Sequence, residues 1–118
     1  MAPVEVLRWE DAPVERLSPS IGRQLLNTER VTLARVLLAA GAVVPEHRHE
    51  HEQVSTLLEG RVRFVVDGEE RVLEAGESLV VRPNAPHAVE ALEQSVVLDL
   101  FAPVRDDWLR GEDAYLRG

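Results

Sequence analysis

The chain contains no cysteine and no lysine. Without cysteine it has no disulfide, no thiolate nucleophile and no cysteine-type zinc site. All 13 basic residues are arginine, which excludes a Schiff base on lysine. Long apolar runs are also missing, because the stretch from Val36 to Val44 is far shorter than the about 20 residues of a transmembrane helix. The sequence does not open with a basic and then an apolar region, so we expect a cytoplasmic protein with no membrane association.

Basic residues are also fewer than acidic ones, 13 against 21. The net charge is −8, and proteins that bind nucleic acid need a basic face, so we expect no nucleic-acid partner. The apolar content of 45% is ordinary for a globular protein, and low-complexity tracts are absent, which argues against global disorder. The length of 118 residues fits one domain, residues 1–118, with a core of its own.

Short runs with β-branched residues dominate the chain from residue 54 onward, and glycine-containing or proline-containing turns separate them. The runs are 54–58, 62–66, 71–73, 79–81, 87–91 and 96–101. Asp67-Gly68 between two of them predicts a hairpin with a type I′ turn. Residues 31–40 fit a buried helix or a strand, and we favour a strand because Gly41 closes the run. Many short strands at these intervals predict an all-β sandwich or barrel.

Both ends of the chain differ from this pattern. We expect a strand at residues 4–7, a loop broken by prolines, and a second strand near residues 23–27. After Pro103, Asp106 and Asp107 favour the start of a short C-terminal helix, which Gly111 would end. Trp108 and Leu109 would dock on the exterior of the barrel, and residues 112–118 would fray.

Three of the four histidines, His47, His49 and His51, lie within seven residues that end at Gln53. In an extended strand a spacing of two places these side chains on one face, where imidazoles can converge on a cation. Nitrogen donors suit zinc, nickel, copper or iron better than calcium or magnesium. The alternative is a polar loop with nothing bound.

Two groups of residues together resemble the two motifs of the cupin superfamily. They are Gly41, His47, His49, Gln53 and Gly60, followed by Gly76, Pro83 and His87. The resemblance covers roughly residues 31–101 and implies an all-β, single-domain cupin jelly-roll β-barrel with a short C-terminal helix. It also implies one divalent transition metal, such as nickel, zinc, iron or manganese, held by His47, His49, Gln53 and His87. With this ligand set complete, His51 is expected beside the metal rather than on it.

Gln53 departs from the general cupin pattern, in which the corresponding residue is glutamate. Three imidazoles and an amide are all neutral, so the metal would keep its full divalent charge and act as a stronger Lewis acid. The same neutrality predicts weaker metal binding than a carboxylate would give.

A narrower resemblance accounts for this departure. Pectin-degradation cupins of the KdgF type, which linearise unsaturated uronates, are similar in the run Gln53-Val54-Ser55 and in residues 99–106. The resemblance implies that Asp99 and Arg105 are catalytic and that Phe101 contacts the substrate. From the residues alone, Asp99 either faces a buried site, or it points to solvent or pairs with an arginine. Arg105 would lie on the surface or bind a substrate carboxylate through two guanidinium nitrogens. Phe101 would be a core residue or would contact the substrate.

The resemblance implies an enzyme that converts 4,5-unsaturated uronate monosaccharides, the products of pectin or alginate breakdown, to linear ketoaldehydes. Its partner would be a small acidic sugar, and similar cupins are frequently homodimers. The alternatives are a metal-dependent cupin dioxygenase and a non-enzymatic sugar-binding or sensor module. Arg23 and Arg35 lie in apolar strands and either face the cavity or sit on the outer sheet face.

Overall fold

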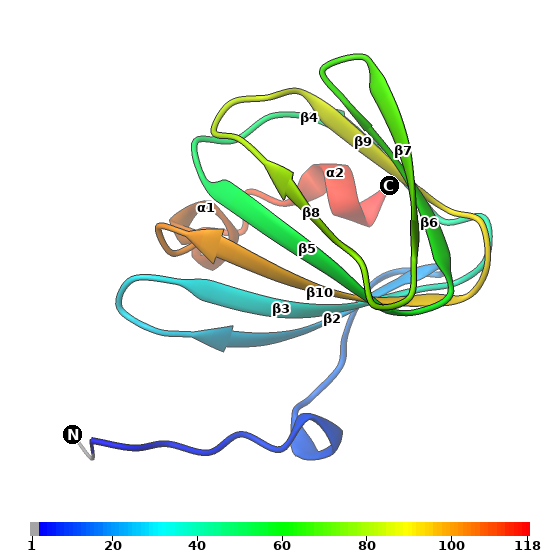
Figure 1. Ribbon diagram of the computed structural model, residues 1–118. Helices are drawn as coiled ribbons and strands as arrows, with labels where there is room; N and C mark the ends of the chain where they lie inside the picture. The colour runs from blue at the N-terminus through cyan, green and yellow to red at the C-terminus, as the bar shows by residue number, and fades with distance from the viewer. Residues whose placement is uncertain (1–2) are drawn as a thin grey trace.

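Alternating apolar residues and tight turns fold this chain into antiparallel strands. The computed structural model describes residues 3–118 (Figure 1). Its strands are β1 (Glu15–Ser18), β2 (Ile21–Asn27), β3 (Thr32–Leu38), β4 (Val43–His47), β5 (Glu52–Glu59), β6 (Arg61–Val66), β7 (Glu69–Glu74), β8 (Ser78–Val81), β9 (His87–Ala91) and β10 (Ser95–Ala102). The all-β prediction is confirmed.

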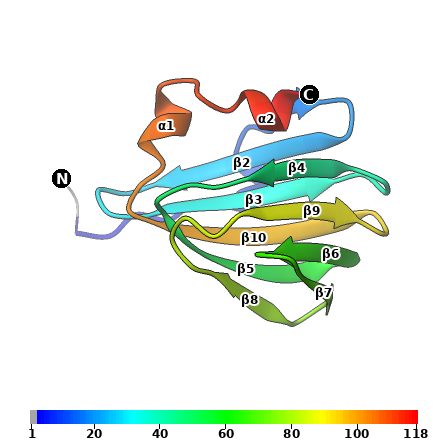
Figure 2. The same ribbon diagram turned by 90° about the horizontal axis from the view of Figure 1, so that it is seen from above.

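The strands form two sheets that face each other as in a jelly roll (Figure 2). One sheet has the order β1-β2-β3-β10-β5-β8, and the other has the order β4-β9-β6-β7. The predicted hairpin joins β6 to β7, and both of its central residues, Asp67 at φ 48° and Gly68 at φ 81°, adopt the positive φ of a type I′ turn. The predicted strand at residues 31–40 is β3.

The core lies between the two sheets. On β6, Val62 and Phe64 point inward and are at most 1% exposed, whereas Arg63 on the opposite face pairs with Glu90 of β9. Burying each such apolar side chain contributes about 1.5–3 kcal/mol. The period of two along the strands therefore decides which side chains enter the space between the sheets.

The N-terminal prediction is partly wrong. Residues 4–7 form no strand, and Val6 is 92% exposed. A 3-10 helix, η1 (Trp9–Asp11), follows this extended segment. The local alternation of Val4 and Val6 is strand-like, but no neighbouring strand pairs with it, and a strand needs a partner for its backbone hydrogen bonds. The strand expected near residues 23–27 is present as β2.

The C-terminal segment crosses the open end between the sheets. The predicted helix is α1 (Asp106–Leu109), and Gly111 follows it at φ 79°. A second helix, α2 (Ala114–Arg117), contacts β4 and β1, so residues 112–118 are ordered against the barrel and the predicted fraying is wrong. Trp108 is only 9% exposed and lines the interior, which corrects its predicted position on the exterior. Among residues 3–118 no helix is long and apolar enough to cross a membrane.

Candidate metal centre

The four predicted ligands come from both sheets. Gln53 lies on β5, next to β10, while His47 ends β4 and pairs with His87 at the start of β9. His49 lies in the loop between β4 and β5. The single extended strand that we expected through residues 47–53 is therefore wrong, since β4 ends at His47 and β5 begins at Glu52. A change of direction in the chain, rather than a spacing of two on one face, brings these residues together.

The three histidines form a group that can hold a metal ion. One ring nitrogen from each of His47, His49 and His87 lies within 4.8 Å of the others. Their ring centroids are separated by 4.2 Å for His47 and His87, 4.9 Å for His49 and His87, and 5.7 Å for His47 and His49. Imidazole nitrogens at such separations lie close enough to share one transition-metal ion.

Backbone carbonyls fix the tautomer of all three rings. The Nδ1 atoms of His47 and His87 donate to the carbonyl oxygen two residues earlier, at 2.8 and 2.9 Å, and that of His49 donates to the carbonyl oxygen two residues later, at 3.0 Å. A neutral imidazole that donates through Nδ1 has its lone pair on Nε2. The three lone pairs are therefore available at the centre of the group, and the carbonyls act as the outer hydrogen-bond partners that orient metal-bound histidines.

A hydrogen-bonded chain orients the amide of Gln53. Its Nε2 donates to Ser55 Oγ at 2.9 Å, and Ser55 Oγ donates to Asp99 Oδ1 at 2.5 Å. Asp99 and Ser55 are directly opposite in the β10–β5 pairing, and Ser55 is fully buried. Because the carboxylate accepts, the serine proton points to Asp99 and the amide nitrogen points to the serine. The amide oxygen of Gln53 is thereby turned toward the histidines.

Two contacts in the group are unfavourable without a cation. His49 Nε2 lies 3.1 Å from Gln53 Oε1. The Nδ1 proton of His49 already goes to a carbonyl, so two lone pairs face each other in this contact. His87 Nε2 is buried without a hydrogen-bond partner, a costly arrangement for a polar atom. A divalent transition metal fits these residues, because one ion can accept all of these lone pairs.

Arg105 and Phe101 form a wall of the same space. Arg105 is 1% exposed, and its Nε and Nη2 donate to both carboxylate oxygens of Asp107, at 3.0 and 2.8 Å. Its guanidinium lies 4.6 Å from the ring centre of Phe101, and the rings of Phe101 and His49 are nearly perpendicular with centroids 5.7 Å apart. The surface alternative for Arg105 is therefore excluded. The two nitrogens expected to bind a substrate carboxylate, Nε and Nη2, already donate to Asp107, so Nη1 is the remaining donor group.

Comparison with known proteins identifies the family. A family model for the cupin domain matches residues 34–101. The chain belongs to the cupin family. This cupin is 32% identical over 103 residues to the pectin degradation protein KdgF of Dickeya dadantii (strain 3937), and the match covers 85% of this chain and 94% of that protein.

Solved structures agree with this assignment. The structure of KdgF from Halomonas sp. matches with a TM-score of 0.80 and 32% identity, over 84% of this chain and 94% of that one. An RmlC-like cupin from Shewanella frigidimarina NCIMB 400 matches with a TM-score of 0.80 and 31% identity, over 84% and 90% of the two chains. The protein is a homologue of KdgF, and the predicted resemblance is confirmed.

Burial sets the charges in the site of this cupin. Desolvation lowers the pKa of His47 to about 4 and that of His49 to about 3, and it also lowers the pKa of His87. All three rings are therefore neutral at pH 7 and able to bind a cation. Desolvation raises the pKa of Asp99 to about 6, against the hydrogen bond from Ser55 and the charge of Arg105, which both lower it. The carboxylate of Asp99 is thus a stronger base than an exposed aspartate.

A cavity of about 50 Å³ lies at the centre of the site. The predicted site residues that line it are His47, Gln53, His87, Asp99, Phe101 and Arg105. Asp99 therefore faces the interior rather than solvent. His51 is 4% exposed but lies to one side, with Nε2 3.8 Å from Asp107 Oδ1, outside the group of three histidines.

Sequence reasoning missed several lining residues of this cupin. Trp108 and Tyr115 enter the cavity wall from the C-terminal segment, whose short helices give no clear periodic signal. Arg23 also lines the cavity, whereas Arg35 donates to Gln24 at 2.8 Å and does not line it. The period of two places Arg23 on the same face of β2 as Ile21, which is 2% exposed, and this signal could have identified it.

Proposed function

We propose that this cupin opens the ring of 4,5-unsaturated uronate monosaccharides and releases a linear ketoaldehyde. The observation that carries the proposal is the hydrogen-bonded chain from Gln53 through Ser55 to Asp99, which joins a set of neutral candidate metal ligands to a carboxylate with a raised pKa. The similarity to KdgF, a pectin degradation protein, supports an acidic sugar as the substrate.

The proposed metal ligands are His47, His49, Gln53 and His87, and the ion would be nickel, zinc, iron or manganese. When bound, it would polarise the substrate oxygens without changing its oxidation state. A second cupin activity, dioxygen chemistry, requires a redox-active metal, and no feature of the described residues favours it.

Asp99 is the proposed proton carrier. Its carboxylate takes the proton of the anomeric hydroxyl while the bond between C1 and the ring oxygen breaks and the C1 aldehyde forms. The electron pair moves onto the ring oxygen, which becomes the oxygen of an enolate at C5. Asp99 then returns the proton to C4, and the C5 ketone forms. The step is an isomerisation, so no other reactant is needed.

Arg105 is the proposed carboxylate-binding residue. Its Nε and Nη2 are held by Asp107, so Nη1 is the group that remains for the substrate carboxylate. Phe101 packs beneath the guanidinium and against His49, and it would keep water away from the reacting atoms. Three predictions from the sequence stay predictions. They are that residues 1–118 form one domain, that the protein is a homodimer and that it is cytoplasmic.

The test follows the ultraviolet absorbance of the conjugated double bond of an unsaturated galacturonate with the purified, metal-loaded protein. Asp99→Asn keeps the shape of the side chain and removes the base. Ser78→Ala is the matched control, because the Ser78 hydroxyl forms an exposed hydrogen bond with Thr56 and neither residue lines the cavity. Faster decay with the wild type and with Ser78→Ala than with Asp99→Asn would support the proposal. Decay at the spontaneous rate with all three proteins would refute it, and oxygen uptake with bound iron would then point to the dioxygenase.

A further inference from the structure

The C-terminal segment brings the single tyrosine of the chain to the metal centre. The ring of Tyr115 stacks on His47, with a centroid distance of 4.4 Å and an angle of 26° between the rings. Tyr115 lines the same cavity as Asp99 and Arg105, although about 60 residues separate it from the first histidine motif. Neither cupin motif includes this residue.

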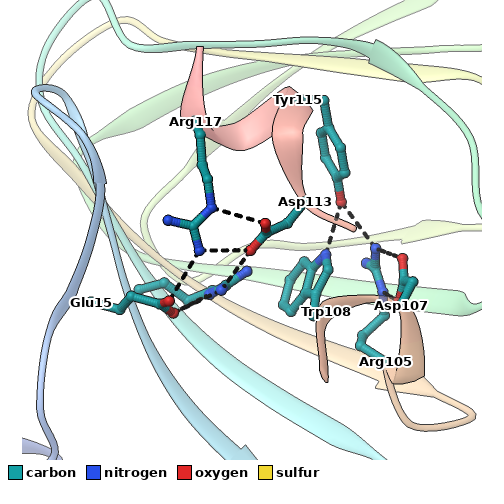
Figure 3. A network of polar contacts seen from close by, with 8 residues as sticks. Glu15, Arg105, Asp107, Trp108, Asp113, Tyr115 and Arg117 are labelled. Carbon is teal, nitrogen blue, oxygen red and sulfur yellow. Dashed lines mark hydrogen bonds and ion pairs between the residues drawn. The ribbon is translucent and has the colours of Figure 1, made fainter. Parts of the chain in front are cut away.

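The hydroxyl of Tyr115 accepts two hydrogen bonds but donates none. Its hydroxyl oxygen accepts from Arg105 Nη2 at 2.9 Å and from Trp108 Nε1 at 3.0 Å (Figure 3). Guanidinium and indole nitrogens can only donate, so both lone pairs of the hydroxyl are used. The O–H bond must point away from both donors, and no side chain or backbone group among residues 3–118 accepts it. It is a free donor at the cavity wall.

An ion-pair network, buried at Arg23 and Asp113 and exposed at Glu15 and Arg117, holds Tyr115 in this position (Figure 3). Asp113, two residues earlier, is 1% exposed and accepts from Arg23 Nη2 at 2.9 Å and from Arg117 Nε at 2.9 Å. Glu15 accepts from the same two arginines, at 2.7 Å from Arg23 and 3.1 Å from Arg117. These contacts tie α2 to β1 and β2, so the hydroxyl is fixed before any ligand arrives.

The free donor lies beside Arg105, the residue proposed to bind the substrate carboxylate. Tyr115 Oη is hydrogen-bonded to Arg105 Nη2. The free Nη1 of Arg105 belongs to the same guanidinium, so the two donors are neighbours. One carboxylate can therefore accept from both. The neighbouring cation also polarises the hydroxyl and strengthens the hydrogen bond that it donates.

We propose that Tyr115 is a specificity-determining residue whose hydroxyl donates a hydrogen bond to the carboxylate of the bound uronate, beside Arg105. This inference rests on the proposed function.

Tyr115→Phe is the test, because phenylalanine keeps the stacking on His47 and loses only the hydroxyl. The variant should raise KM for the unsaturated uronate about tenfold, as for one lost hydrogen bond to a charged group, while kcat changes little. The inhibition constant of saturated galacturonate should rise by the same factor. Inhibition by galactose, which has no carboxylate, should not change. Metal content and thermal midpoint are measured for both proteins, and rates are expressed per metal-loaded molecule.

The outcomes separate this inference from the function on which it rests. Equal weakening of galacturonate and galactose, or no weakening of either, would overturn the role of Tyr115 while the wild type still linearises uronates. A wild type that neither turns over the unsaturated uronate nor binds galacturonate would overturn both. A selective loss of galacturonate binding in Tyr115→Phe supports the inference, because a general loosening of the site would weaken the binding of both sugars.

Discussion

Replacing Ser55 with alanine should weaken metal binding without directly touching a proposed ligand. The serine hydroxyl accepts from Gln53 and donates to Asp99, so alanine removes both bonds and frees the amide to rotate. Loss of an outer hydrogen-bond partner typically costs about 10- to 100-fold in metal affinity. That range corresponds to about 1.4–2.7 kcal/mol. Loss of the two buried hydrogen bonds should also lower the free energy of unfolding by about 1–3 kcal/mol.

The assay is competition for the metal against a chromophoric chelator, with Ser55→Ala, Ser55→Thr and Ser78→Ala side by side. Ser55→Thr keeps the hydroxyl and should bind metal nearly as the wild type does. Ser78→Ala removes the exposed hydroxyl pair with Thr56 and should leave metal affinity unchanged. If Ser55→Ala binds metal as tightly as Ser78→Ala, the hydroxyl does not orient the amide and the reasoning fails.

The same substitution should change the pH dependence of turnover. The hydrogen bond from Ser55 lowers the pKa of Asp99, which desolvation raises to about 6. Without that bond the pKa rises further, and the basic carboxylate form is lost at a higher pH. The acid limb of the kcat profile of Ser55→Ala should therefore lie at higher pH than that of the wild type. A limb that stays in place, or moves to lower pH, would contradict the assignment of Asp99 as the base.

Three further changes test the site and the C-terminal segment. Gln53→Glu should bind metal more tightly and turn over more slowly, because it adds a negative charge next to the ion and removes the donor to Ser55; isothermal titration and the absorbance assay measure both. Removing the metal with a chelator should lower the thermal midpoint. A metal present at 100 times its Kd stabilises the folded state by about 2.7 kcal/mol, and the chelator removes this contribution. Asp113→Ala should lower the free energy of unfolding by about 3 kcal/mol. This is the low end of the cost of breaking a buried ion pair, because Arg23 keeps its second carboxylate partner, Glu15. Hydrogen bonds from Arg117 and Arg23 hold the pKa of Asp113 below its usual value, so its contribution is complete above about pH 4 and is lost as the pH falls through the folded-state pKa. Urea titrations of the wild type and Asp113→Ala should therefore converge in acid, and a constant difference between them down to pH 2 would refute this.

The sequence predicted the barrel well because its signals are local. A strand needs a period of two and a turn with suitable residues, and Asp67-Gly68 supplies both positive φ angles within two positions. The convergence of the histidines was predicted for the wrong geometric reason, since His49 lies in a loop and not on the strand of His47. The motif spacing carries the information that the strand argument lacked.

The C-terminal segment was predicted poorly because its order is not local. A helix of four residues has almost no intrinsic stability, and tertiary contacts decide whether it forms. Asp113 is buried only because Arg23, 90 residues earlier in the chain, meets it across the barrel mouth. The orientation of Arg23 was undecided for the same reason, since its partner could not be read from the strand in which it lies. Single-sequence patterns do not reveal such long-range ion pairs.

In the proposed complex, the neutral metal ligands and the acidic substrate would be linked by charge. A divalent ion on three imidazoles and an amide keeps two positive charges, and Arg105 is already balanced by Asp107. Asp99, which lines the same cavity, would supply one negative charge, which would leave one positive charge to be balanced in a desolvated space. In the proposed complex the carboxylate of the uronate supplies it. A glutamate in place of Gln53 would balance that charge permanently and weaken the attraction for an anionic sugar, so under this proposal the amide would favour the substrate at the expense of metal affinity.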